Sequence, residues 1–324
     1  MTRYIIRRIL WFIPVLFAII LATFVFVRAI PGGPFDFVGD KSLPPSVVAN
    51  LKAKYHLNEP MWKQFARYLY DVVVKQDLGP SYRYRGRTVN EIIRDALPIS
   101  TQLGLLSLLL GLAIGLPTGI IAALKQNSAI DYGSTFVAIL GVSIPNIVLG
   151  PLLIWIFSLK LNWFPVARWG AQAPFFLGFL PVPNLTFWKY AILPTVTLGT
   201  GLSASIARLT RASLLQTIRE DYIRTARAKG LAERVVIVRH ALKNSMIPVV
   251  TILGPMFAMV VTGTFTTEQI FGIPGLGKHF VTSVGNRDYP VVVGTTLLYS
   301  VFLVIANLLV DITYAWLDPR IRYD

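Results

Sequence analysis

The sequence predicts an all-α membrane protein with six transmembrane helices, an external domain after the first helix, and a short cytoplasmic helix between the fourth and fifth. Of its 324 residues, 54% are hydrophobic and only 15% are charged, whereas soluble proteins carry about 25% charged residues. The basic residues, which give a net charge of +15, punctuate long apolar runs, so they indicate a membrane topology and no nucleic-acid partner. Cysteine is absent and the three histidines are scattered, so we expect neither a disulfide nor a metal site.

Six segments are long and apolar enough to cross a bilayer, which takes about 20 residues in a helix. They cover residues 9–27, 99–124, 133–159, 190–209, 246–266 and 291–316. The first segment could instead be a cleaved signal peptide. Its apolar run is longer than the usual core of about 7–15 residues and no A-x-A cleavage site follows, so we expect an uncleaved span.

Basic residues predict the orientation. The segment after the fourth span carries nine Lys or Arg against three acidic residues, and both termini are also basic. By the positive-inside rule these regions face the cytoplasm. The expected organisation is therefore a first helix (1–30), an external insert in the periplasm or outside the cell (31–98), a five-helix core (99–317) containing a cytoplasmic loop (211–245), and a cytoplasmic tail (318–324).

The second, third and fifth spans contain no ionisable residue at all, although ion-coupled transporters place such groups at membrane depth. Asp311 near the end of the last span is expected to form a helix-end pair or a packing contact. The sequence therefore provides almost no candidates for a path lined by carboxylates. Paired acids and bases, a nucleophile elbow and metal-ligand spacing are also missing, so we do not expect an enzyme.

One stretch, residues 272–279, comes close to a phosphate-binding loop. It reads G-x-x-x-x-G-K, but His279 stands where Ser or Thr should bind Mg²⁺. Pro274 also removes a backbone donor, and the topology places the loop outside, away from cytoplasmic ATP. We expect instead a tight external turn built on Gly272, Pro274, Gly275 and Gly277.

The cytoplasmic loop contains a predicted short helix at residues 221–229. Asp221 can cap its start, and Gly230 can end it in a left-handed conformation. Ala226 and Ala228 keep this helix slim, so that it can enter a groove on another protein. The basic side chains equally suit a loop that rests on anionic lipid headgroups, and the residues alone leave both interpretations open.

At these residues the sequence resembles a known family. Its Ala-Arg-Ala-Lys-Gly-Leu core, followed by His240-Ala-Leu-Lys-Asn244 and Ile247-Pro248, is similar to the EAA loop of ABC importer permeases, and most closely to the dipeptide/oligopeptide/nickel group. The stretches Phe271-Gly-Ile-Pro-Gly-Leu-Gly277 and Asp318-Pro-Arg-Ile-Arg-Tyr323 and the N-terminal Arg-Arg-Ile-Leu agree with it. The resemblance covers nearly the whole chain except residues 36–75. Asp221 departs from it, standing where the name of the motif implies Glu.

The resemblance implies a non-catalytic half-channel in the inner or plasma membrane of a prokaryote. A second homologous permease would complete the path, and an external binding protein would deliver di- or oligopeptides, with nickel complexes or oligosaccharides as alternatives. The long insert suggests the permease with the longer external loop. ATP and Mg²⁺ would bind only to two cytoplasmic ATPase subunits. These would dock on the coupling helix formed by Asp221, Tyr222, Arg224, Thr225, Ala226, Arg227, Ala228, Lys229 and Gly230.

Polar residues on otherwise apolar spans are candidates for lining the translocation path. They are Thr101, Gln102, Ser107, Ser143, Asn146, Thr195, Thr197, Ser203 and Asn307. Hydrogen bonds between helices, worth about 0.6 kcal/mol each, are the alternative role for any one of them. A stand-alone channel or secondary carrier is the rival class of function, but it requires ionisable groups or polar rings at mid-span.

Overall fold

The computed structural model describes residues 2–35, 44–171, 175–181 and 184–317, and within these ranges its regular elements are all helices, beside two isolated bridges. The elements are α1 (Thr2–Ala29), α2 (Pro45–Lys54), α3 (Met61–Val74), α4 (Val89–Leu124), α5 (Ala129–Ser143), α6 (Asn146–Leu153), the π-helix η1 (Ile154–Lys160), α7 (Leu185–Ile218), α8 (Asp221–Ala228), α9 (Glu233–Val235), the π-helix η2 (Val236–Leu242), α10 (Lys243–Val261), α11 (Phe265–Ile270), α12 (Leu276–Asn286) and α13 (Tyr289–Leu317). The tail 318–324 lies outside the described residues.

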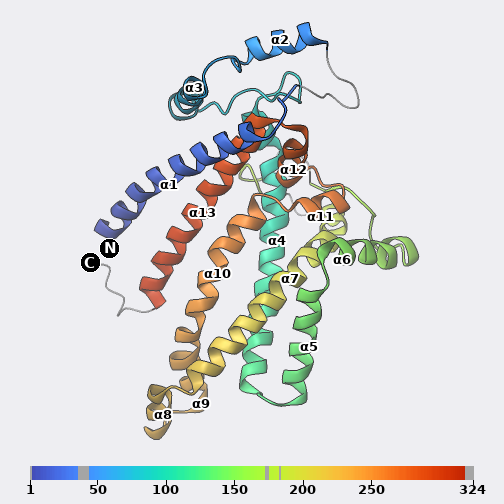
Figure 1. The fold of residues 1–324 in the computed structure, drawn as a ribbon. Coiled ribbons are helices and arrows are strands. Elements are labelled where there is room, and N and C mark those ends of the chain that lie inside the picture. Colours follow the sequence, from blue (N-terminus) through green and yellow to red (C-terminus); the bar gives the residue numbers. More distant parts are fainter. Residues whose placement is uncertain (1, 36–43, 172–174, 182–183, 318–324) are drawn as a thin grey trace.

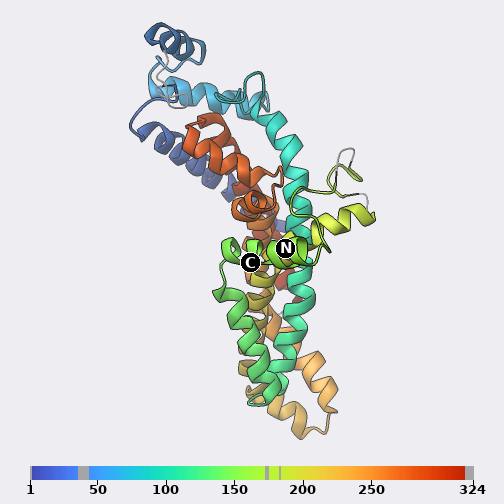
Figure 2. The ribbon, with the colours of Figure 1, turned by 90° about the vertical axis from the view of Figure 1, so that its right-hand side faces the viewer.

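The long helices form an elongated bundle with a distinct structure at each end (Figure 1). Helices α2 and α3 cover one end, which we call the insert end. Helices α8 and α9 lie at the opposite end, which we call the α8 end, and the view turned by 90° shows the same separation (Figure 2). Among the described residues, five helices are long and apolar enough to cross a membrane, and the bent pair of α5 with α6–η1 makes a sixth if it counts as one span. The expected all-α membrane fold is confirmed.

The third predicted span is not a straight helix, which corrects the prediction for residues 133–159. Helix α5 ends at Ser143, and the next helical pair leaves at an angle of 100°. Pro145 causes the break, because a residue before proline is pushed out of the helical region, and Ile144 is accordingly extended with φ −84° and ψ 110°.

Helices α4 and α7 extend beyond the predicted spans. Helix α4 starts ten residues early, because Thr88 and Glu91 form a capping box in which each side chain accepts a hydrogen bond from the other residue's backbone N–H, at 3.2 and 3.0 Å. Helix α7 runs to Ile218, so residues 211–218, predicted as part of the loop, are helical.

Helices α4 and α7 form the centre of the bundle through glycines on α4. A Cβ atom added to Gly115 would lie 2.6 Å from the Ser203 carbonyl oxygen, and one added to Gly119 would lie 2.5 Å from that of Ala207. Gly111 similarly faces the Cβ of Leu202, at 3.0 Å. The small-xxx-small pattern of this helix therefore marks a close backbone approach, as expected in membrane bundles.

Helices α1 and α13 lie side by side and antiparallel (Figure 1). An ion pair between Arg8 and Asp311, 2.8 Å apart, joins the start of one to the far end of the other. Asp311 thus forms a helix-end pair, as predicted, and the described ends of α1 and α13 lie together.

Candidate functional site: the α8 helix and the polar residues of the bundle

Helix α8 is a short element that is defined at both ends. Its N-cap residue is Glu220, which makes no capping hydrogen bond through its side chain, and Asp221 is the first helical residue. The predicted cap was therefore wrong by one position, although an acid in the first turn still favours the helix dipole. At the other end Gly230 has φ +75° and donates a hydrogen bond to the Arg227 carbonyl oxygen at 2.9 Å. The predicted left-handed terminus is confirmed.

One face of α8 is buried against the chain's own helices. Ile223 is 0% exposed and Ala226 is 7% exposed, and both pack in a cluster with Ala123, Leu214, Val236, Ile237 and Ala241. The cluster joins α8 to the ends of α4, α7 and η2. Ala226 is therefore small because it faces the bundle, which corrects the prediction that it contacts a partner's groove. The remaining predicted helix residues, Asp221, Tyr222, Arg224, Thr225, Arg227, Ala228, Lys229 and Gly230, are exposed.

Polar contacts also fix α8 in place. The Arg227 guanidinium donates two hydrogen bonds to the Glu233 carboxylate, at 2.7 and 3.1 Å, across the turn at Gly230. On the other side the Asn244 amide donates to the Tyr222 hydroxyl at 2.9 Å. Sequence reasoning missed Glu233 and Asn244 as partners, because only the turn geometry brings residues this far apart in the chain together.

A hollow of about 520 Å³ lies beside the start of α8. It is lined by Ala212, Leu215, Gln216, Arg219, Glu220 and Asp221. The end of α7 and the first turn of α8 thus present a concave surface next to the convex exposed face of α8. Such a surface can accept a projecting side chain of another protein.

The glycine-rich turn surrounds a buried carboxylate that the sequence analysis did not single out. Glu268, which is 0% exposed, accepts hydrogen bonds from the Ser100 hydroxyl at 2.7 Å and from the backbone N–H groups of Lys278 at 2.9 Å and Thr264 at 3.2 Å. These bonds join α4, α11 and α12. The Lys278 amide, which a phosphate loop would direct at a nucleotide, is therefore directed at the protein's own anion.

The glycines of this turn are explained by close contacts and by one positive φ angle. A Cβ atom on Gly275 would lie 2.3 Å from the Glu268 carboxyl carbon, and one on Gly277 would lie 2.8 Å from the Phe265 nitrogen. Gly272 has φ +60°, and Pro274 lies between Gly272 and Gly275 in the link from α11 to α12. The predicted turn is therefore present. Separately, within the described residues no group of three or more His, Cys, Asp or Glu side chains could hold a metal ion.

The predicted path residues divide into two groups. The buried group consists of Gln102, Ser107, Thr197 and Ser203. The group that keeps exposed surface consists of Thr101, Ser143, Asn146, Thr195 and Asn307. Gln102 accepts a hydrogen bond from the Trp169 indole at 2.7 Å and donates to the Phe179 carbonyl oxygen at 2.8 Å. In this conformation the buried side chains contact the chain's own interior, and the hydroxyl of Thr195 is buried as well, so the other four residues of the second group are the ones available to a path.

An ion pair that the sequence did not reveal holds α5 to α7. Asp131, 1% exposed, accepts two hydrogen bonds from the Arg211 guanidinium, at 2.6 and 2.7 Å, and a third from the Asn127 backbone at 2.9 Å. The pair is bidentate, which is the strongest geometry for such ions. Arg211 is therefore a structural residue of α7 and not a free loop cation.

Comparison with known proteins now identifies the family. Residues 115–323 match the family model described as binding-protein-dependent transport system inner membrane component, and residues 1–104 match the model of the N-terminal part of such components. The chain belongs to this family. It is thus a multi-pass permease component of an ABC transporter, and the resemblance to ABC importer permeases is confirmed.

Two relatives of this permease are similar over their whole length. The oligopeptide transport system permease protein OppB of Salmonella typhimurium is 42% identical over 323 residues, which is 100% of both chains. The dipeptide transport system permease protein DppB of Bacillus subtilis is also 42% identical, over 99% of this chain and 98% of its own.

Two solved structures share the fold. An amino acid ABC transporter crystallised with histidines has a TM-score of 0.51 at 15% identity, covering 69% of this chain and 93% of its own. The MetNI methionine ABC transporter in an inward-facing conformation also has a TM-score of 0.51, at 18% identity, covering 72% of this chain and 98% of its own.

Proposed function

We propose that this permease forms half of the translocation path of an ATP-driven importer of di- or oligopeptides. The names of the full-length relatives support peptides as the cargo over nickel complexes or oligosaccharides. A second permease subunit completes the path, an external binding protein delivers the peptide, and two cytoplasmic ATPase subunits bind and hydrolyse ATP. The chain itself contributes no catalytic group.

The proposed orientation places the α8 end in the cytoplasm and the insert end outside. Basic residues crowd the segment from Arg208 to Lys243, and such segments stay on the cytoplasmic side. Both termini share this side, because Arg8 and Asp311 bring the described ends of α1 and α13 together.

The observation that best supports the proposal is the packing of α8 against the bundle. Its inner face is locked into a cluster with α4, α7 and η2, while Tyr222, Arg224, Thr225 and Ala228 remain exposed. A helix held in this way transmits the movement of a docked ATPase subunit directly to the membrane helices, since closely packed interiors transmit strain. A loop resting on lipid needs no such rigid attachment.

The path is proposed to lie where this chain meets the second permease. Thr101, Ser143, Asn146 and Asn307 are the candidates, because these polar residues keep exposed surface, whereas the hydroxyl of Thr195 is buried. Single cysteines at these positions should react with aqueous thiol reagents in at least one transport state, whereas cysteines at Ser107 and Thr197 should stay protected.

Co-purification with the ATPase subunits, followed by peptide-stimulated ATP hydrolysis, tests the assignment. Ala228→Trp should abolish binding of the ATPase subunits. Ala228 is exposed on α8, and a bulky ring at this position would prevent the helix from entering the groove of the ATPase subunit. Ala49→Trp, at an exposed position of α2, is the matched control and should retain binding. Arg224→Ala should be mild, since an exposed charge contributes about 0–1 kcal/mol. Full ATPase binding by Ala228→Trp would contradict the docking role of α8.

A further inference from the structure

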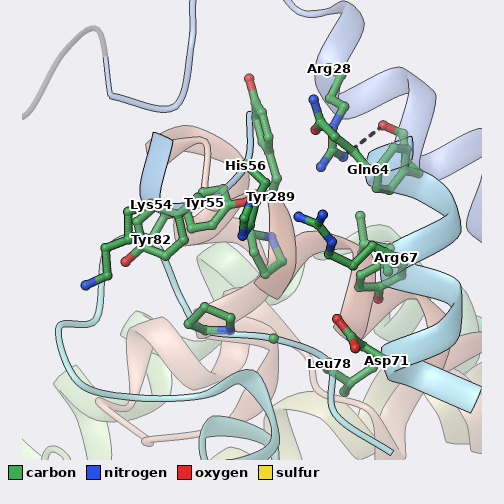
Figure 3. A pocket seen from close by; sticks show the side chains of 16 residues that line it. Arg28, Lys54, Tyr55, His56, Gln64, Arg67, Asp71, Leu78, Tyr82 and Tyr289 are labelled. Atoms are coloured by element: carbon green, nitrogen blue, oxygen red, sulfur yellow. Dashed lines mark hydrogen bonds between the residues drawn. The ribbon is translucent and has the colours of Figure 1, made fainter. Parts of the chain in front are cut away.

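A cavity of about 330 Å³ lies in the insert end, outside the sites described above. It is enclosed by the end of α1, the helices α2 and α3, and the start of α13 (Figure 3). Its wall includes Phe24, Arg28, Tyr55, Tyr68, Tyr82 and Tyr289. These residues come from five separate segments, including the link from α3 to α4 that carries Tyr82, so the cavity exists only in the assembled insert.

The aromatic rings form a nearly continuous wall with polar tips. The Tyr55 and Tyr82 ring centroids are 4.6 Å apart, and those of Tyr82 and Tyr289 are 6.2 Å apart. Burial raises the pKa of Tyr82 to about 12 and also raises the pKa of Tyr68, so both phenols stay neutral donors. The buried Tyr68 hydroxyl has no hydrogen-bond partner among the described residues.

The positive charge of the cavity is only partly compensated. Arg67 pairs with Glu59 at 3.0 Å, and Asp71, the acid that lines the cavity, pairs with Lys75 at 2.7 Å. Two cations, Arg28 and Lys54, have no carboxylate partner in the part of the chain that the structure describes.

Arg28 is held firmly in the cavity wall. Its guanidinium carbon lies 3.4 Å from the centroid of the Phe24 ring, and it donates to the Gln64 side chain at 3.1 Å and to the Phe24 carbonyl oxygen at 3.3 Å. Figure 3 shows this group and Arg67 directed toward the hollow. Each guanidinium has five donors, so both retain N–H groups for an anion.

The cavity lies beside apolar surface. Phe65 of α3 packs against Phe17 and Phe24 of α1, with ring centroids 5.8 and 5.2 Å apart. The outer face of α3 leaves Trp62 and Val73 more than half exposed. An amphipathic helix with a tryptophan on its apolar face is typical of an element lying in the membrane interface.

We propose that this cavity binds the phosphate of an anionic membrane phospholipid. Arg28 and Lys54 supply the charge and the Tyr68 hydroxyl donates a hydrogen bond, while the acyl chains follow the apolar faces of α1 and α3. A bound lipid would fasten the insert to the membrane surface. This site is independent of the proposed peptide transport, because it lies in the insert and not among the path candidates.

Native mass spectrometry of the purified chain from nanodiscs tests the proposal. From mixed phosphatidylglycerol and phosphatidylcholine, the parent chain should retain phosphatidylglycerol. Arg28→Gln and Lys54→Gln should each reduce the retained fraction about fivefold, the expected effect of one basic residue near an anionic surface. Arg94→Gln, whose side chain is 81% exposed outside the cavity, is the matched control and should retain the lipid.

The second arm of the experiment separates a lipid from a free anion. Inorganic phosphate, added to nanodiscs of pure phosphatidylcholine, should neither bind measurably nor raise the melting temperature. Equal lipid retention by the parent and the Lys54→Gln variant, an exposed change that leaves the fold intact, would overturn the proposal. Binding of inorganic phosphate as tight as that of phosphatidylglycerol would also overturn it.

Discussion

Truncating Ile223 should detach α8 from the bundle. The side chain is 0% exposed and, apart from Ala226, is the only buried residue of that helix. Removing a buried isoleucine side chain to alanine costs about 2–5 kcal/mol. The remaining polar contacts, Arg227 with Glu233 and Asn244 with Tyr222, are exposed, and an exposed ion pair contributes only about 0–1 kcal/mol. An isolated helix of eight residues is unstable in water, so Ile223→Ala should raise the local opening equilibrium of α8 roughly 30- to 4,000-fold.

Hydrogen exchange of the purified permease measures this opening directly. Amides of residues 223–230 should lose protection by that factor, while amides in the centres of α4 and α7 keep theirs. Val238→Ala, a truncation at a position that is 57% exposed at the same end, is the control and should change protection by less than about threefold. Unchanged protection in Ile223→Ala would show that the buried cluster around Ile223 does not hold α8 against the bundle.

Three further outcomes are expected. Gly115→Ala should lower the melting temperature, because its Cβ would lie 2.6 Å from the Ser203 carbonyl oxygen. In Gly133→Ala the added Cβ meets nothing within 4 Å, so this variant should raise the melting temperature through better helix propensity. The reverse order of melting temperatures would contradict the close packing of α4 on α7. Lys278→Ala should leave ATP hydrolysis by the assembled transporter near normal, and its loss without loss of assembly would revive the phosphate-loop interpretation. Burial lowers the pKa of His279, so the stability of the fold should fall as pH drops below about 6.5, where only the unfolded chain takes up the proton. Between pH 7.5 and 5.5 the melting temperature of His279→Gln should therefore fall less than that of the parent protein. An equal fall in both proteins would exclude His279 as the cause.

Local patterns in the sequence predicted much of this structure. Apolar runs located the membrane helices, and Gly230 marked the end of α8. Each signal depends on a local property of a few neighbouring residues, such as their hydrophobicity or a positive φ that favours glycine. These requirements can be read without knowing the fold.

Long-range contacts could not be predicted in this way. Ala226 looked like a contact for a partner, because its small size fits a groove equally well on either side of the helix. Glu268 and Asp131 lie just outside the predicted spans, where a carboxylate normally means solvent, and their partners Ser100 and Arg211 are 168 and 80 residues away. The 100° bend at Pro145 also escaped prediction, since membrane helices tolerate some prolines without breaking.

In the proposed function, the exposed face of α8 docks on a cytoplasmic ATPase subunit. The chain contains no cysteine, so a single Thr225→Cys on that face can carry a photoactivatable crosslinker in the assembled transporter. We expect a crosslink to an ATPase subunit, and none from the same label at Ala49→Cys on α2. An intact complex in which Thr225→Cys gives no crosslink to the ATPase, or reacts with a membrane-impermeant thiol reagent from outside the cell, would show that α8 does not dock on the ATPase in the cytoplasm.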